Sequence, residues 1–228
     1  MSDNQDTWVI IPVYNEEKVI AQVINELLPV FPNVVCVDDG SRDTSASEIA
    51  ATRAHLVRHP VNLGQGAALQ TGLSYALARH GAQYFVTFDA DGQHRVTDAA
   101  KMVAVAREGN VDAVLGSRFL EGAETVPLAK RVVLRAAAML SRSGRRLRLT
   151  DAHNGLRVLT RPVAERLRIR MNDMAHASEI VACLAAGDWR VKEVPVTILY
   201  TDYSRSKGQS LVNGVNILFD FSMRNRRI

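Results

Sequence analysis

Cysteine, aromatic residues and long apolar runs are all scarce in this chain of 228 residues. The two cysteines, Cys36 and Cys183, lie in apolar runs and are expected to be buried thiols, which excludes a disulfide-stapled scaffold. No run approaches the ~20 apolar residues of a membrane-spanning helix. The polar residues 1–6 also lack the plan of a signal peptide. We therefore expect a cytoplasmic chain without a membrane span of its own.

Aromatic residues make up only 6% of the chain, and the basic stretches lack the interleaved stacking side chains of single-strand binders. We therefore expect no nucleic-acid partner. Charge is instead divided along the chain. Residues 1–115 hold 8 Lys+Arg and 14 Asp+Glu, whereas residues 116–228 hold 20 and 10. The acidic half favours metal binding, and the basic half favours a phosphate-bearing or membrane-surface partner.

Short apolar runs alternate with stretches of helical spacing through the first half of the chain, and less regularly through the second. The predicted strands span residues 7–13, 34–37, 55–58, 84–88, 113–116, 155–159 and 190–200, the last interrupted by Pro195. The predicted helices span residues 16–28, 66–79, 127–140, 177–186 and 212–223, with two more capped by Ser41 or Asp43 and by Thr97. This order predicts an α/β fold with a Rossmann-like, mostly parallel central sheet and helices on both faces.

Polar clusters follow several of these strands, at the sheet edge where ligands of such folds bind. The strongest is Asp89-Ala90-Asp91-Gly92-Gln93-His94, in which two carboxylates two residues apart can meet one hard cation. Mg²⁺ and Mn²⁺ take oxygen ligands and share them with substrate phosphates, and Gln93 can add a carbonyl oxygen. The alternative interpretation is a polar turn between a strand and a helix.

Two further clusters leave the same choice open. Asp38-Asp39-Gly40-Ser41 is either a turn with a helix cap or a carboxylate site for a base or ribose. The segment from Pro12 to Glu17 is either a turn with acidic residues in a first helical turn or part of a ligand site. The glycines near residues 64–66 do not form a dinucleotide fingerprint, because Leu69 stands where the third glycine belongs.

The combination of these clusters is more specific than any one of them. In order and spacing, and together with Asn62-x-Gly64, they resemble the GT-A family 2 of inverting glycosyltransferases. Further segments are similar to the dolichyl/polyprenyl-phosphate mannose and other sugar synthases of that family. These segments are Gly116-Ser117-Arg118, Asp151 with Asn154-Gly155-Leu156-Arg157, and Tyr203 to Ser210. The resemblance covers about residues 7–215. Asn154 departs from the serine that the family often has there.

The resemblance implies a GT-A nucleotide-diphospho-sugar transferase fold and a metal-dependent hexosyltransferase using Mg²⁺ or Mn²⁺. It implies a donor of the GDP-mannose or UDP-glucose type, and a polyprenyl (dolichyl or undecaprenyl) phosphate as acceptor. It places the metal on Asp89, Asp91 and Gln93, with Asp91 also catalytic. The implied nucleotide-sugar pocket comprises Pro12, Tyr14, Glu16, Asp38, Asp39, Asp89, Ala90, Asp91, Arg205 and Lys207.

The basic half is the implied acceptor side. Arg118 and Arg131 match the acceptor-phosphate arginines, and Arg118 is counted among the catalytic residues together with Asp151. Asp151 matches the base of relatives with hydroxyl acceptors, and here it either acts as a base or orients an arginine. Segments 126–148 and 211–223 are candidates for docking on the inner face of a membrane. Packing of these segments in the core or in a homodimer is the alternative.

We expect one catalytic domain over residues 1–228. Its nucleotide-sugar and metal half covers about residues 1–118, its acceptor half covers about residues 119–228, and no transmembrane domain is expected. Two other functions remain open at this point. One is a family 2 glycosyltransferase acting on a sugar hydroxyl in polysaccharide or glycolipid synthesis, for which Asp151 would be an essential base. The other is a non-catalytic nucleotide-sugar-binding protein.

Overall fold

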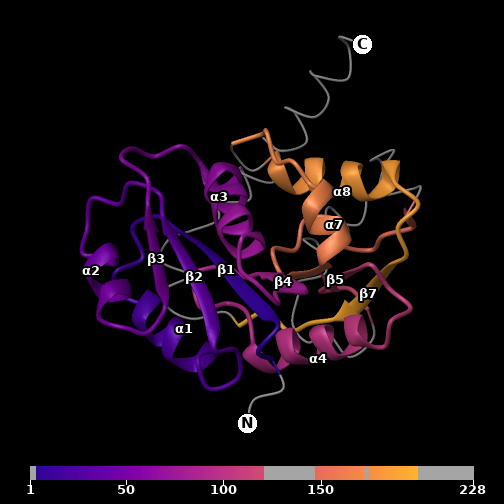
Figure 1. The fold of residues 1–228 in the computed structure, drawn as a ribbon, viewed down its shortest axis with the longest axis horizontal. Helices are drawn as coiled ribbons and strands as arrows, with labels where there is room; N and C mark the ends of the chain where they lie inside the picture. The colour runs from indigo at the N-terminus through magenta and orange to yellow at the C-terminus, as the bar shows by residue number, and fades with distance from the viewer. Residues whose placement is uncertain (1–3, 121–146, 173–174, 200–228) are drawn as a thin grey trace.

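The computed structural model describes residues 4–120, 147–172 and 175–199 (Figure 1). Within them, seven strands form one sheet in the order β3-β2-β1-β4-β6-β5-β7. The strands are β1 (Thr7–Val13), β2 (Asn33–Asp38), β3 (His55–Arg58), β4 (Tyr84–Thr87), β5 (Ala113–Ser117), β6 (Arg157–Thr160) and β7 (Val191–Pro195). Neighbouring strands pair in parallel except that β6 runs antiparallel to β4 and β5. The predicted α/β class with a mostly parallel sheet is confirmed.

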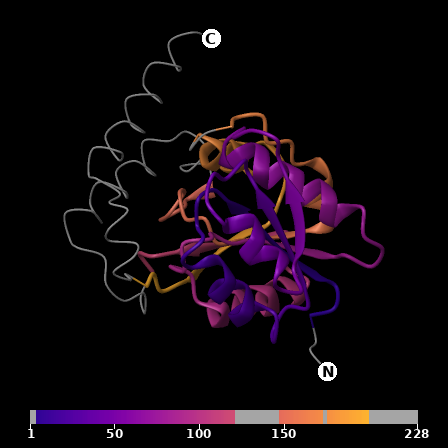
Figure 2. The same cartoon turned by 90° about the vertical axis from the view of Figure 1, so that its left-hand side faces the viewer.

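Helices cover both faces of this sheet, as the alternation of apolar residues in β1 requires. Val9 and Ile11 face one core, whereas Trp8 and Ile10 face the other. Figure 1 shows the two layers of helices and Figure 2 shows them from the side. The helices of the first core are α1 (Ile20–Leu27), α2 (Ser45–Ala50) and α4 (Val96–Arg107), and those of the second are α3 (Gln65–Leu77), α7 (Arg161–Arg166) and α8 (His176–Ala186).

Several predicted boundaries were wrong. Helix α1 begins at Ile20 rather than at residue 16, because the preceding residues form a turn in which the Glu16 carbonyl accepts the N–H groups of Val19 and Ile20. Helix α4 begins at Val96, so Thr97 lies inside its first turn and does not cap it. Helix α2 begins at Ser45, whose N–H donates to Asp43.

The second half differs more from expectation. Helix α7 was not predicted, and it begins directly after β6 with Pro162 in its first turn, where a missing N–H costs no hydrogen bond. Strand β7 ends at Pro195, and residues 196–199 continue to an isolated bridge between Ile198 and His94. The predicted helices over 127–140 and 212–223 lie outside the described residues. Among the described helices, none is long and apolar enough to cross a membrane.

Candidate active site

One edge of the sheet gathers the predicted site residues. The parallel strands β1, β2, β4 and β5 end there, and β6 begins there because it runs the other way. Pro12 is buried within β1, opposite Val37 of β2, and Tyr14, just beyond the strand, is 42% exposed. The chain therefore brings segments up to about 150 residues apart in sequence to a common edge, as open α/β sheets do at their ligand sites.

The loops that follow β1 and β2 are fastened to each other. The backbone N–H groups of Asn15 and Glu16 donate to the hydroxyl oxygens of Ser41 and Ser45, at 3.0 and 2.8 Å. Asn15 has a positive φ of 55°, and its side-chain oxygen accepts the N–H of Arg42 at 2.9 Å. These contacts hold the segment containing Tyr14 and Glu16 in a fixed turn at the sheet edge.

Asp38 and Asp39 are almost fully buried, and both hold loops in place. Asp38 accepts the N–H of Ser41 at 3.1 Å and pairs with Arg58 at 3.2 Å. Asp39 accepts the backbone N–H groups of Leu63 and Gly64 at 2.9 and 2.8 Å, and its Oδ1 lies 2.7 Å from His59 Nδ1. Both carboxylates are thus used in the structured turn that was the alternative interpretation, and a role of Asp38 and Asp39 toward a nucleotide stays a prediction.

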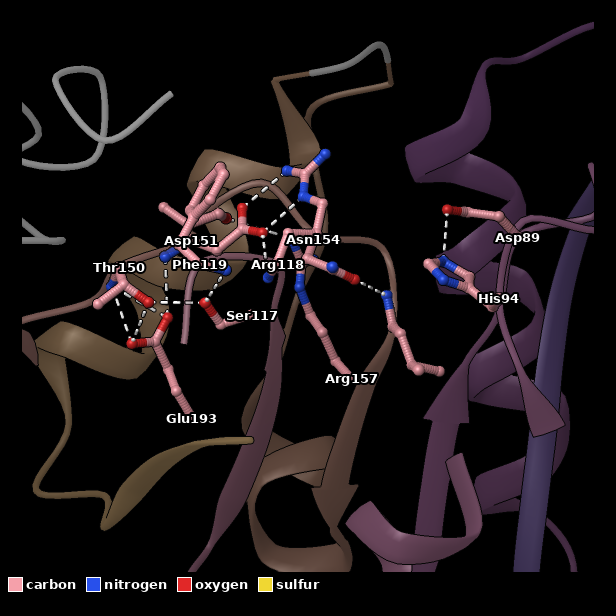
Figure 3. Close-up of polar contacts among 12 residues, drawn as sticks. Asp89, His94, Ser117, Arg118, Phe119, Thr150, Asp151, Asn154, Arg157 and Glu193 are labelled. Carbon is pink, nitrogen blue, oxygen red and sulfur yellow. Dashed lines mark hydrogen bonds and ion pairs between the residues drawn. The ribbon is translucent and has the colours of Figure 1, made fainter. Parts of the chain in front are cut away.

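The acidic loop after β4 holds two carboxylates in different environments. Asp89 Oδ2 lies 2.9 Å from His94 Nε2 (Figure 3). Gln65 donates to Asp89 Oδ1 at 3.3 Å. Burial acts to raise the pKa of Asp89, but the hydrogen bond and charge of His94 and the charge of Arg157 bring it below its ordinary value. Burial and the neighbouring charge of Asp89 raise the pKa of Asp91 to about 6.

This loop fits part of a divalent cation site. In the described parts of the chain, no three His, Cys, Asp or Glu side chains converge as a complete protein cage would require. Two carboxylates are nevertheless held close enough to raise the pKa of Asp91, and a cation between them would relieve that repulsion. Mg²⁺ and Mn²⁺ are commonly bound by one or two carboxylates together with substrate phosphates. Asp89 and Asp91 therefore fit such an ion, with Gln93 beside them.

A second cluster lies across the edge from the acidic loop, around Arg118 and Asp151. Arg118 Nε and Nη2 donate to the two carboxylate oxygens of Asp151 at 2.6 and 2.7 Å, and the Arg118 backbone N–H donates at 3.1 Å (Figure 3). The Asp151 side chain is 1% exposed and that of Arg118 is 18% exposed. Burial raises the pKa of Asp151, but the hydrogen bonds and charge of Arg118 outweigh burial and lower it overall.

Arg157 lies between the two clusters (Figure 3). It is 2% exposed, and burial lowers its pKa to about 10 against the opposing charges of Asp89 and Asp151. Two residues before it, in the loop that leads into β6, Gly155 packs on Asp89 so closely that a Cβ atom there would lie 2.2 Å from Asp89 Oδ2. The loop of residues 151–157 thus contacts both clusters at once.

Sequence reasoning located part of this site and missed the rest. Arg118 and Asp151 were both named, and the structure pairs them across 33 residues. Gln65 and Glu193 were not named, although Gln65 contacts Asp89 and Glu193 binds the backbone of Asp151. Gln65 stands between the two glycines already noted, Gly64 and Gly66, but was given no role, and Glu193 lies within a strand that carries no motif. Arg131, Arg205 and Lys207 lie outside the described residues.

The family model described as Glycosyl transferase family 2 matches residues 8–168, which is more than half of the chain. The chain belongs to this family. The match includes the acidic loop after β4 and the Arg118–Asp151 pair, so both clusters fall within the family's own region.

Relatives agree with this membership, and a solved structure shares the fold. The chain is 30% identical to UDP-N-acetylglucosamine--dolichyl-phosphate N-acetylglucosaminyltransferase of Methanococcus voltae, over 95% of this chain and 94% of that one. It is also 30% identical to polyprenol monophosphomannose synthase of Mycolicibacterium smegmatis, over 93% and 83%. Glucosyl-3-phosphoglycerate synthase of Mycobacterium tuberculosis, solved with Mn²⁺ and UDP-glucose, superposes with a TM-score of 0.70 at 18% identity, over 92% and 73%. The expected GT-A fold is thereby confirmed.

Proposed function

We propose that this family 2 glycosyltransferase moves a hexose from a nucleotide diphosphate sugar to a polyprenyl phosphate at a membrane surface. Mannose from GDP-mannose and glucose from UDP-glucose are the candidate donors, and one domain carries a donor half over about residues 1–118 and an acceptor half over about 119–228. The two relatives named above support a lipid phosphate as acceptor, since one name specifies dolichyl phosphate and the other specifies polyprenol monophosphomannose as the product.

The state of Asp151 is the observation that carries this proposal. An acceptor hydroxyl needs a base to remove its proton, and a base is effective when its pKa lies near the working pH. Asp151 instead has a lowered pKa and uses both oxygens to hold Arg118. A phosphate acceptor arrives already ionised and needs a cation to place it rather than a base. The Arg118 guanidinium, fixed by Asp151, is a group of that kind.

The bonds of the proposed reaction follow from this assignment. An ionised oxygen of the acceptor phosphate attacks the anomeric carbon, the bond from that carbon to the donor diphosphate breaks, and the nucleoside diphosphate leaves with the electron pair. No proton has to move. Arg118 and Arg131 place the acceptor phosphate, and the contacts of Asp89 with His94 and Gln65 fix the orientation of its carboxylate.

The donor side is proposed from the same residues that the sequence singled out. Pro12, Tyr14, Glu16, Asp38, Asp39 and Ala90 form the nucleotide-sugar pocket with Asp89 and Asp91, and Arg205 and Lys207 contact the diphosphate. Asp89, Asp91 and Gln93 would hold Mg²⁺ or Mn²⁺, which supplies positive charge where the leaving diphosphate becomes more negative.

Transfer to a matched pair of lipids tests the proposal. The full chain is incubated with Mn²⁺ or Mg²⁺, labelled nucleotide sugars, and either undecaprenyl phosphate or undecaprenol, which differs only by the phosphate. We expect label in the organic phase with the phosphate alone, and none with Asp91→Ala. Label with undecaprenol as well, or with neither lipid while nucleotide sugar still binds, would overturn the proposal and favour a sugar hydroxyl as acceptor.

The pH profile of Asp151→Asn separates a base from a positioning group. If Asp151 holds Arg118, the variant raises KM for undecaprenyl phosphate. In that case, the plot of wild-type kcat against pH shows no fall that titration of Asp151 explains. If Asp151 is a base, the wild-type plot shows such a fall, and the variant loses it together with roughly a hundredfold or more in kcat. Asp112→Asn is the matched control, because Asp112 also pairs with an arginine, Arg190, but at the opposite end of β5.

A further inference from the structure

The carboxylate of Glu193 in β7 is bonded to the short segment that carries Asp151. Glu193 Oε1 and Oε2 accept the backbone N–H of Thr150 at 3.0 and 2.8 Å, and Oε1 accepts the backbone N–H of Asp151 at 2.9 Å (Figure 3). The Thr150 hydroxyl donates to Oε2 at 3.0 Å. One carboxylate thus accepts hydrogen bonds from two consecutive backbone N–H groups and a hydroxyl, all of which belong to Thr150 and Asp151.

The same segment has a second attachment, on the strand that carries Arg118. Thr150 Oγ1 lies 2.6 Å from Ser117 Oγ, and Ser117 Oγ accepts the backbone N–H of Phe119 at 3.2 Å. Ser117 is fully buried at the end of β5, one residue before Arg118. Thr150 is therefore held between β7 and the end of β5, and these contacts fix the distance between the Asp151 backbone and Arg118.

Glu193 is connected to Arg118 through two successive contacts: Glu193 binds the Asp151 backbone, and the Asp151 carboxylate binds Arg118. The Asp151 carboxylate can hold the Arg118 guanidinium in one place only while the Asp151 backbone itself stays in place, and Glu193 accepts the N–H of that residue. We infer that Glu193 is a positioning residue of the acceptor-phosphate site, and that it sets the location of the Arg118 guanidinium through Asp151. The inference rests on the proposed function, because that proposal assigns the acceptor phosphate to Arg118.

The strand that carries Glu193 is held by other contacts as well. Strand β7 pairs with all five residues of β5. Beyond it, the backbone N–H groups of Val196, Thr197 and Leu199 donate to the carbonyl of Ser117, the carboxylate of Asp98 and the carbonyl of Gln93, at 2.9 to 3.0 Å. Replacing the Glu193 carboxylate should therefore leave β7 in place and release mainly the Thr150–Asp151 segment.

Kinetics of Glu193→Gln in the full chain test the inference. The glutamine amide keeps one acceptor oxygen but places an NH₂ group where the second oxygen accepts the Thr150 backbone N–H, so part of the clamp is lost. With undecaprenyl phosphate as acceptor, we expect KM for that lipid to rise roughly tenfold, as a displaced positioning group would cause. Binding of the nucleotide with Mn²⁺ should stay within about twofold, because the acidic loop is unchanged. Asp112→Asn, on the same pair of strands, should change neither constant.

A double-mutant cycle separates positioning from a general structural effect. If Glu193 acts through Arg118, Glu193→Gln has no further effect on KM for undecaprenyl phosphate once Arg118→Ala is present. An effect that persists in the Arg118→Ala background, an unchanged KM in the single variant, or an equal loss of nucleotide binding would overturn the inference.

Amide hydrogen exchange tests the contact of Glu193 with Thr150 and Asp151 without any assumption about the acceptor, so its result is independent of the proposed function. The amides of Thr150 and Asp151 should exchange faster in Glu193→Gln than in wild type or Asp112→Asn, whatever the substrate is. Unchanged exchange at these amides overturns the clamp. If the amides exchange faster but wild type transfers no sugar to undecaprenyl phosphate, the clamp is supported and it is the proposed acceptor that fails.

Discussion

At the scale of single residues, Asp91 is a carboxyl group whose ionised form the surrounding protein disfavours. Partial burial, the charge of Asp89 and, more weakly, that of Glu16 raise its pKa to about 6 from the ordinary 3.8, and only the Gln93 N–H and the charge of His94 act in the other direction. A folded protein has little structural reason to hold such a group, and clustered like charges of this kind mark functional sites. We expect Asp91 to lower stability in the absence of a cation.

Replacing Asp91 by asparagine tests this expectation. The folded state binds the Asp91 proton more tightly than the unfolded state does, so the stability it contributes is present at low pH and is lost as pH rises through about 6. At about 1.4 kcal/mol per pKa unit, discounted for partial exposure, Asp91→Asn should raise the free energy of unfolding near neutral pH by about 1–2 kcal/mol. Denaturant unfolding of the metal-free protein should show this gain disappearing as pH falls to about 3, below both pKa values.

Asp43 provides the control with the opposite sign. Although burial acts to raise the pKa of Asp43, hydrogen bonds from the side chain and backbone of Ser45 and from the backbone of Glu17 lower it overall. Its contribution to stability is therefore present above its unfolded pKa and is lost as pH falls through the lower folded value. Asp43→Asn should destabilise the protein near neutral pH. A loss of stability in Asp91→Asn as well would contradict the view that Asp91 is held at a cost.

At the scale of elements, α3 approaches the sheet through small side chains. Ala68 and Ala76 are fully buried, and Gly72 lies over β1 and β2. A Cβ atom at Gly72 would lie 2.4 Å from Ile10 Cγ2 and 3.2 Å from Val37 Cγ2. Glycine at position 72 has a lower helix propensity than alanine, but the absence of a Cβ atom allows the helix to pack closely on the sheet.

Gly72→Ala tests this packing, because two effects of opposite sign compete. Helix propensity favours alanine by about 1 kcal/mol, whereas crowding against a branched core side chain typically costs about 1–3 kcal/mol. We expect a net loss of about 1 kcal/mol, measured by denaturant unfolding. Ser74→Ala on the exposed face of the same helix should be close to neutral. Stabilisation by Gly72→Ala would mean that α3 can shift away from Ile10 at little cost.

The elements show how far the sequence predicts the fold. The strands of the first half were placed within one or two residues, because buried β-branched runs bounded by turn residues have a strong local signal. The predicted start of α1 was wrong because Ser45, at the start of α2, accepts the Glu16 backbone N–H and holds it in a turn before the helix begins. The antiparallel direction of β6 and the helix α7 follow from tertiary packing, which local spacing does not contain.

The sequence likewise predicts some features of the candidate site and not others. Asp89, Asp91, Arg118 and Asp151 stand in recognisable motifs at strand ends, so the sequence named them. What the sequence could not provide is the pairing of Arg118 with Asp151, since no periodicity relates two residues that stand 33 positions apart. Glu193 lies in an ordinary strand segment, 42 residues beyond Asp151, and only the register of β7 on β5 brings it to the site.

At the scale of the whole molecule, the two halves differ in charge as well as in proposed role. Residues 116–228 carry 20 Lys+Arg against 10 Asp+Glu, and the window 124–148 alone holds seven basic residues and one acidic residue. An acceptor with a long polyprenyl chain is reached at a lipid surface, and basic segments contribute roughly 1 kcal/mol per residue near an anionic surface. The charge division therefore suits an enzyme whose acceptor half meets the membrane.

Sedimentation with vesicles tests this division of charge. We expect the protein to bind vesicles that contain anionic lipid more strongly than neutral ones, and to be released between about 0.05 and about 0.5 M salt as the Debye length shortens. Arg135→Glu/Arg142→Glu should lower the bound fraction, because both arginines belong to the basic window. Arg53→Glu/Lys101→Glu, an equal change of charge in the acidic half, should lower it much less. An equal fall in both double variants would mean that net charge, rather than the basic window, governs binding. Neither half of the chain would then be the preferred membrane-binding half.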